Sequence, residues 1–157
     1  MRGSWLLILI AMTALVRGCW AESVDIVAPS DISFGVIDIA SNCAGSPSPS
    51  TISFSDAQLL PGKALRISVI AVQDSFTSTG GSPISCTGVS WSIGNATGGS
   101  GASGRLSNTI YTTVYESSPN PSSGSVDINW SLDPCATGVF AGAHVLVLRW
   151  KLESVGG

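Results

Sequence analysis

The residues with the strongest chemistry in this sequence are few and widely spaced. Its 157 residues include one histidine, His144, and four cysteines. A Ser-His-Asp site needs a base held between a nucleophile and an acid, and no Gly-x-Ser-x-Gly elbow occurs. Structural zinc sites use closely spaced cysteines, and no Cys-x-x-Cys pair is present. The sequence therefore predicts no catalytic residue, no cofactor and no metal ligand, and it argues against an enzyme.

Carboxylates are the remaining candidates for acid–base chemistry. The chain has ten acidic residues, and two carboxylates at a suitable separation hydrolyse glycosidic bonds. Nothing in their spacing marks two of them as a pair, and many fall at expected strand ends, where they satisfy turns or guard edges. A small secreted hydrolase is the third interpretation of the sequence.

The first 21 residues have the pattern of a signal peptide. Arg2 supplies a basic start, residues 5–16 are apolar, and Cys19-Trp20-Ala21 places small residues at the positions that a signal peptidase reads. The apolar run is shorter than the roughly 20 residues that a membrane helix needs. We expect one domain over residues 22–157, located outside the cell or on its surface. Lipidation of Cys19 remains an alternative, and it would be the protein's one membrane attachment.

Cleavage after Ala21 changes both the charge and the cysteine count. Ten acidic residues then face five basic ones, so the net charge becomes −5 and clustered basic residues for nucleic acid are absent. Three cysteines remain, Cys43, Cys86 and Cys135. Exported proteins usually pair their thiols, so one disulfide and one extra cysteine are expected. Cys86–Cys135 and Cys43–Cys86 are both open.

Strand patterns recur along the chain, and no segment shows sustained helical periodicity. Turn residues separate alternating or apolar runs, and the expected strands cover residues 23–27, 31–39, 51–54, 64–72, 89–93, 109–116, 125–132 and 142–153. Residues 94–104 are expected to form a flexible glycine-rich loop, which contains a glycosylation acceptor at Asn95. This pattern predicts a single antiparallel β-sandwich of about eight strands, immunoglobulin-like or jelly-roll.

Three tryptophans share the pattern Trp-x-aliphatic near the ends of expected strands. These are Trp91, Trp130 and Trp150, and large aromatic side chains supply much of the buried area of a small core. We expect them to be core anchors. In the last strand, His144, Leu146, Leu148, Trp150 and Leu152 alternate onto one face, which leaves Val145, Val147, Arg149 and Lys151 on the other.

Two terminal segments resemble known families. The opening Val24-Asp-Ile-Val-Ala-Pro-Ser-Asp-Ile-Ser-Phe-Gly35 resembles the first strand of spore coat protein U-like and pilin-like fimbrial subunits. Leu148-Arg-Trp-Lys-Leu152 and Trp130-Ser-Leu132 are similar to the tryptophan motifs of WxL cell-wall-binding domains, although those domains as a rule lack disulfides. The first resemblance implies a structural subunit, and the second implies a polysaccharide partner.

The fimbrial resemblance implies assembly by β-strand addition, in which an extended segment of one subunit joins the sheet of the next. Residues 22–27 are the candidate donor, with Val24 and Ile26 on one face. An ordinary first strand within its own domain is the alternative. We therefore expect an exported structural or adhesive subunit whose partners are copies of itself or other surface subunits. A carbohydrate-binding module that uses Tyr111 and Tyr115 as stacking platforms is the second interpretation.

Overall fold

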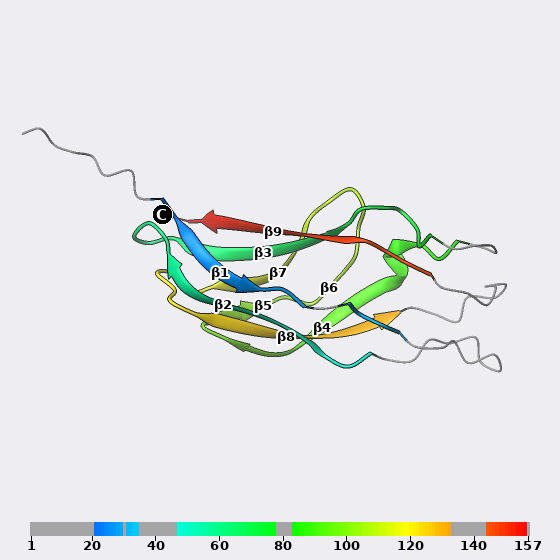
Figure 1. The fold of residues 1–157 in the computed structure, drawn as a ribbon, viewed down its shortest axis with the longest axis horizontal. Helices are drawn as coiled ribbons and strands as arrows, with labels where there is room; N and C mark the ends of the chain where they lie inside the picture. The colour runs from blue at the N-terminus through cyan, green and yellow to red at the C-terminus, as the bar shows by residue number, and fades with distance from the viewer. Residues whose placement is uncertain (1–20, 30, 35–46, 78–82, 133–143, 157) are drawn as a thin grey trace, which may run out of the picture.

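The computed structural model describes residues 21–29, 31–34, 47–77, 83–132 and 144–156. Within them, two antiparallel sheets pack face to face, so the predicted all-β sandwich is confirmed (Figure 1). The five-stranded sheet has the order β1 (Ser23–Val27), β2 (Ser50–Gln58), β8 (Gly124–Leu132), β4 (Val89–Thr97) and β6 (Gly104–Arg105). The four-stranded sheet has the order β5 (Gly99–Gly101), β7 (Thr112–Ser117), β3 (Ala64–Ala71) and β9 (Leu148–Val155).

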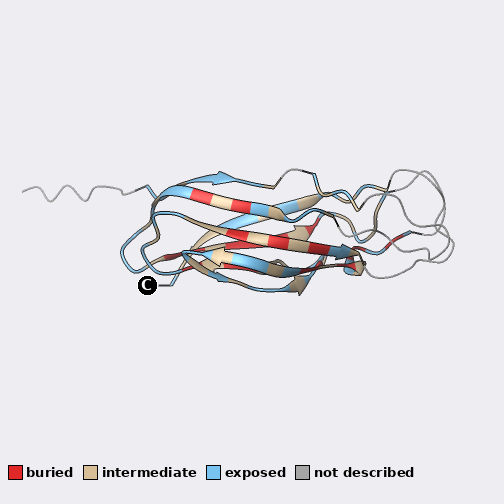
Figure 2. Ribbon diagram, turned by 90° about the horizontal axis from the view of Figure 1, so that it is seen from below, coloured by how far each residue is buried: buried red, intermediate tan, exposed pale blue. Residues whose placement is uncertain are grey.

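The core lies between the two sheets and is formed by the apolar side chains of alternating residues. Buried positions alternate with less buried ones along the strands (Figure 2). In β8, Val126, Ile128 and Trp130 are buried, because every second side chain of the strand points inward. The fully or nearly fully buried cluster comprises Ile52, Phe54, Leu65, Ile67, Val69, Ala71, Cys86, Val89, Trp91, Leu106, Val114, Tyr115, Val126, Ile128 and Trp130.

The three tryptophans lie in one row across this core. Trp91 and Trp130 are directly opposite each other on β4 and β8, with ring centroids 5.7 Å apart. Trp150 comes from β9 in the other sheet, and its ring meets that of Trp130 edge-on at 6.5 Å. Trp91 and Trp130 are buried, whereas Trp150 is half-buried. The row therefore joins the two sheets through aromatic contacts.

The predicted loop at 94–104 is wrong. β4 continues to Thr97, and the chain then forms β5 in one sheet and β6 in the other. Gly98 makes the turn with φ +70, and a Cβ on Gly99 would lie 2.3 Å from the carbonyl oxygen of Glu116. Glycine is needed here because the backbones approach closely. In the sequence, such a glycine-rich segment has the same composition as a flexible loop.

The other strand predictions differ from the structure mainly at their ends. β2 runs longer than the predicted 51–54, and the predicted final strand begins later, at Leu148, after an isolated bridge between Thr77 and Val145. Residues 31–34 are not a strand, and the rest of the predicted strand 31–39 lies outside the described residues. Strand ends depend on pairing partners, which a single-strand pattern does not contain.

Candidate functional site at an open side of the sandwich

The two terminal strands lie on the same side of the sandwich. β1 is the last strand of the five-stranded sheet and β9 is the last strand of the four-stranded sheet. Glu22, just before β1, connects them: its Oε1 accepts hydrogen bonds from the Leu60 backbone N–H at 2.9 Å and from the Ser154 hydroxyl at 2.8 Å. We call this side, formed by β1 and β9, the open side, because each strand has a sheet partner on one flank only within the described residues.

β1 is attached to β2 by its backbone but is barely buried. Asp25, Ile26 and Val27 lie opposite Ser55, Phe54 and Ser53, in antiparallel register. Val24 is half-buried and packs against the core, whereas Ile26 is 36% exposed and Val27 is 67% exposed. Because burial of apolar area is the main driving force of folding, these side chains hold β1 weakly.

Glu22 holds the start of β1 by charge-assisted hydrogen bonds. The Leu60 N–H and the Ser154 hydroxyl lower the pKa of the Glu22 carboxyl, since both bonds favour its ionised form, and Lys63 adds a smaller effect of the same sign. Lys63 itself donates to the carbonyl oxygen of Gly156, just after β9. Sequence reasoning missed Glu22, because its partners are 38 and 132 residues away.

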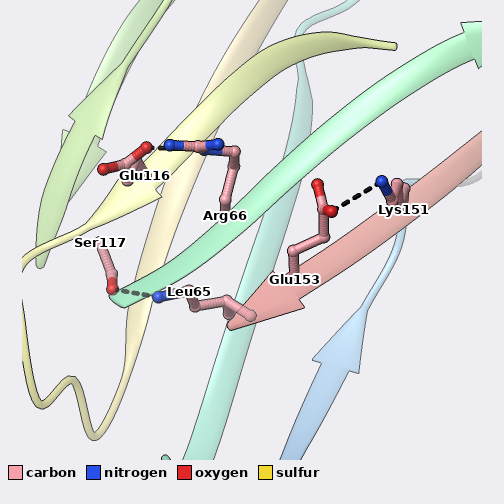
Figure 3. A network of polar contacts seen from close by, with 6 residues as sticks. All are labelled: Leu65, Arg66, Glu116, Ser117, Lys151 and Glu153. Carbon is pink, nitrogen blue, oxygen red and sulfur yellow. Dashed lines mark hydrogen bonds and ion pairs between the residues drawn. The ribbon is translucent and has the colours of Figure 1, made fainter. Parts of the chain in front are cut away.

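β9 presents charged residues outward and apolar residues inward. Leu148 and Trp150 pack against the core, while Arg149 and Lys151 are exposed. Lys151 Nζ lies 2.6 Å from Glu153 Oε1 on the same strand (Figure 3). Leu152 is in phase with the inner face, opposite Ile67 of β3, but it is 37% exposed. The predicted alternation therefore holds as far as Lys151, and Leu152 is only partly covered.

The outer face of the four-stranded sheet brings Arg66 of β3 together with Arg149 and Lys151 of β9, which lie far from it in sequence. The register of β3 with β9 places Arg66 opposite Glu153, Ser68 opposite Lys151 and Ile70 opposite Arg149. Arg66 also forms an ion pair of 2.8 Å with Glu116 of β7 (Figure 3). The sequence pattern showed which residues of each strand point outward, but it did not pair the strands.

The two tyrosines proposed as stacking platforms have different environments. Tyr115 is fully buried, and its hydroxyl donates a hydrogen bond of 2.7 Å to the carbonyl oxygen of Thr97. Burial raises the pKa of this hydroxyl. Tyr111 is half-buried under the Lys151 ammonium, which lies 5.3 Å from the ring centroid. The expectation of an exposed platform at Tyr115 is wrong, because β7 turns two consecutive residues, Val114 and Tyr115, into the core.

The remaining sequence candidates do not converge on one place. Cys86 is buried and bonded to no described residue, while its candidate partners Cys43 and Cys135 lie outside the described residues. Burial and the nearby Asp74 raise the pKa of the Cys86 thiol. His144 is half-buried before β9. In the described part of the chain, no group of His, Cys, Asp and Glu has the arrangement of a metal site.

Asn95 is exposed, on β4 rather than in a loop. It lies where the pairing of β4 with β8 shifts register between Ile93 and Ala96. Its side chain is therefore accessible to a glycan.

One shallow hollow lies beyond β1. It has a volume of about 560 Å³ and is lined by residues 27–29, 31–33 and 47–51. Asp31 is its single ionisable lining residue among those described. Glycoside hydrolysis needs two carboxyl groups, so this hollow does not supply a hydrolase site from the described residues.

Comparisons with known proteins do not assign this sequence to a family. Neither the family models nor the curated proteins gave a match to this sequence. Among the described residues, no helix has the length and apolar character needed to cross a membrane.

Proposed function

We propose that this protein is an exported structural or adhesive subunit of an extracellular assembly, which joins its neighbours by β-strand addition with β1 as the donor. One observation carries the proposal. β1 is a sheet-edge strand whose hydrogen bonds to β2 are main-chain bonds and whose side chains remain largely exposed. Exchange of β1 between copies would reproduce the same hydrogen bonds, so the exchange costs little free energy.

The connection from β1 to β2 is long enough for this exchange. Residues 28–49 separate the two strands, a segment of 22 residues. A fully extended chain of this length spans about 70 Å, which exceeds the length of a β-strand several-fold. The segment is therefore long enough for β1 of one copy to reach the β2 edge of an adjacent copy once Ile32 and Phe34, which pack against the core, are released.

The pairing register supplies a direct test of donation. Asp25 and Ser55 lie opposite each other on β1 and β2. One chain carries Asp25→Cys, a second chain carries Ser55→Cys, and the two are mixed under assembly conditions and then oxidised. Donation predicts a disulfide between the two different chains, identified by peptide mass mapping. A chain with both substitutions is the control for the register, because it forms the same bond without exchange.

Deletion of residues 22–28 tests the same proposal by its effect on assembly. Polymers seen by electron microscopy or analytical ultracentrifugation are expected to disappear, and added peptide of residues 22–28 is expected to bind the deleted chain. Absence of the mixed-chain disulfide, with the double-substituted control formed, would show that β1 stays in its own domain.

A polysaccharide-binding module is the second candidate, and the outer face of the five-stranded sheet favours it. Hydroxyl groups there pair across strands, as between Ser90 and Ser131 at 2.8 Å and between Thr97 and Ser125 at 2.9 Å. Such rows offer hydrogen bonds to sugar hydroxyls. Retention of a monomer on insoluble cell-wall polysaccharide, with retention lost in a Ser90→Ala, Ser131→Ala variant, would support this function over assembly.

A further inference from the structure

β9 has no sheet partner on one flank within the part of the chain that the structure describes, and its side chains have a self-complementary pattern. Lys151 and Glu153 lie on the outer face, two residues apart, with Leu152 between them on the inner face. In an antiparallel pair of two β9 strands centred on Leu152, Lys151 of each copy faces Glu153 of the other. The two Leu152 side chains then face each other, and Trp150 faces Ser154. Directly opposed residues have Cβ atoms about 4.5–5.5 Å apart, within reach of these contacts.

The neighbouring registers are disfavoured by charge. Centring the pair on Lys151 places two lysines opposite each other, and centring it on Glu153 places two glutamates opposite each other. Like charges in directly opposed positions destabilise a sheet. A single lysine on an edge strand usually prevents pairing, but here the glutamate two residues away supplies its complement in one register.

The inner face gains from the same register. Leu152 is 37% exposed although its position in β9 points toward the core. A facing Leu152 from a second copy covers it, and main-chain groups on the second flank of β9 gain hydrogen-bonding partners. β1 belongs to the other sheet and pairs with β2, so among the described residues β9 has no strand partner on its second flank.

We infer that β9 is a symmetric interface, which pairs antiparallel with β9 of a second copy of this chain about a two-fold axis at Leu152. The interface joins two four-stranded sheets into one sheet of eight strands. It uses β9 alone, so it is independent of the donation of β1. In an assembly whose subunits are linked through β1, the β9 interface would join one row of linked subunits to a second row.

Charge exchange tests this register. Lys151→Glu gives two acidic residues on each β9, and Glu153→Lys gives two basic ones, so each variant alone should dimerise at least about tenfold more weakly than the wild type. An equimolar mixture of the two variants should form a heterodimer, because every opposed pair is again of opposite charge. The double variant Lys151→Glu, Glu153→Lys should restore the homodimer. Sedimentation equilibrium measures all four, with circular dichroism to verify that each chain is folded.

A cross-link at the axis gives a second measurement. With Leu152→Cys, oxidation should join two copies by a disulfide between the substituted positions, mapped by mass spectrometry. Arg149→Cys is the control, since the two copies of this residue would lie about 20 Å apart in the proposed register. A wild-type protein that stays monomeric at all concentrations, a variant mixture no more dimeric than its components, or equal cross-linking at both positions would overturn the inference.

Discussion

The two lateral sides of the sandwich are built in opposite ways. On one side, which we call the closed side, the chain passes from β4 to β5 and back to β6, so it crosses between the sheets twice within residues 97–105. On the open side, β1 and β9 end their sheets, and Glu22 connects them through side-chain hydrogen bonds.

The two sides differ in how the two sheets are connected: on the closed side the chain itself passes between the sheets, and on the open side only side-chain hydrogen bonds connect them. On the closed side, the Trp91 indole N–H donates to the carbonyl oxygen of Ala102 at 2.8 Å, and Ala102 N–H donates to Val114 at 2.8 Å. The strands at its rim are also very short, with three residues in β5 and two in β6. Short edges resist pairing with other chains. The open side has longer edges and weaker closure, which is why both proposed interfaces lie there.

The largest loss of stability is expected from Trp91→Ala. Trp91 is buried, packs on Trp130 and supports the crossing at Ala102. Truncation of a buried tryptophan costs about 3–5 kcal/mol in the free energy of unfolding. Chemical denaturation measures this cost, with the exposed neighbour Ser92→Ala as a control and Ile26→Ala as the open-side counterpart. An equal cost for Ile26→Ala would contradict the contrast between the sides.

Gly99→Ala is expected to have the next largest effect. A Cβ at this position would meet the Glu116 carbonyl oxygen at 2.3 Å and the Ser117 Cα at 2.5 Å, so the backbones of β5 and β7 must separate. We expect a loss of about 2 kcal/mol, as for other overpacked sites. Gly94→Ala is the matched control, because its nearest atom is a side-chain nitrogen at 3.1 Å. Equal stability of the two variants would show that close approach does not hold the closed side.

Tyr115→Phe is expected to cost about 1 kcal/mol, the net value of one hydrogen bond. The lost bond is the one from the Tyr115 hydroxyl to Thr97 at the end of β4. Since burial raises the pKa of this hydroxyl in the folded state, its stabilising effect is complete below the ordinary pKa of tyrosine and is lost as pH rises through the folded pKa. As pH is raised into the alkaline range, the melting temperature should therefore fall less for Tyr115→Phe than for the wild type. An identical alkaline profile would argue against this role.

The smallest change in stability is expected from Glu22→Ala on the open side. The bonds from Leu60 and Ser154 are lost, and the start of β1 loosens while the rest of the sandwich keeps its packing. Compared with the wild type, the variant should show faster amide hydrogen exchange in β1 and unchanged exchange in β3. Because the pKa of Glu22 is lowered by folding, the same loosening should occur in the wild type as pH falls below the ordinary pKa of glutamate and through the lowered one. Unchanged exchange in β1 would show that Glu22 does not hold it.

Some of the fold could be read from the sequence because it is local. The period-two pattern of residues 125–132 identified β8 and its inner face, and the alternation at 64–72 identified β3. The candidate site was less accessible. β1 was recognised as a strand, but the contact of Glu22 with Ser154 depends on two segments 132 residues apart.

By itself, the sequence determined an all-β chain, the inner and outer faces of its main strands, and the aromatic residues available for a core, because side-chain alternation is a local property. Only the tertiary structure decided which strands are neighbours, since pairing is a choice among distant segments. That choice made the glycines of 98–104 into a packed crossing and buried Tyr115. It also placed β1 and β9 at the ends of their sheets, where neither has a second strand partner among the described residues.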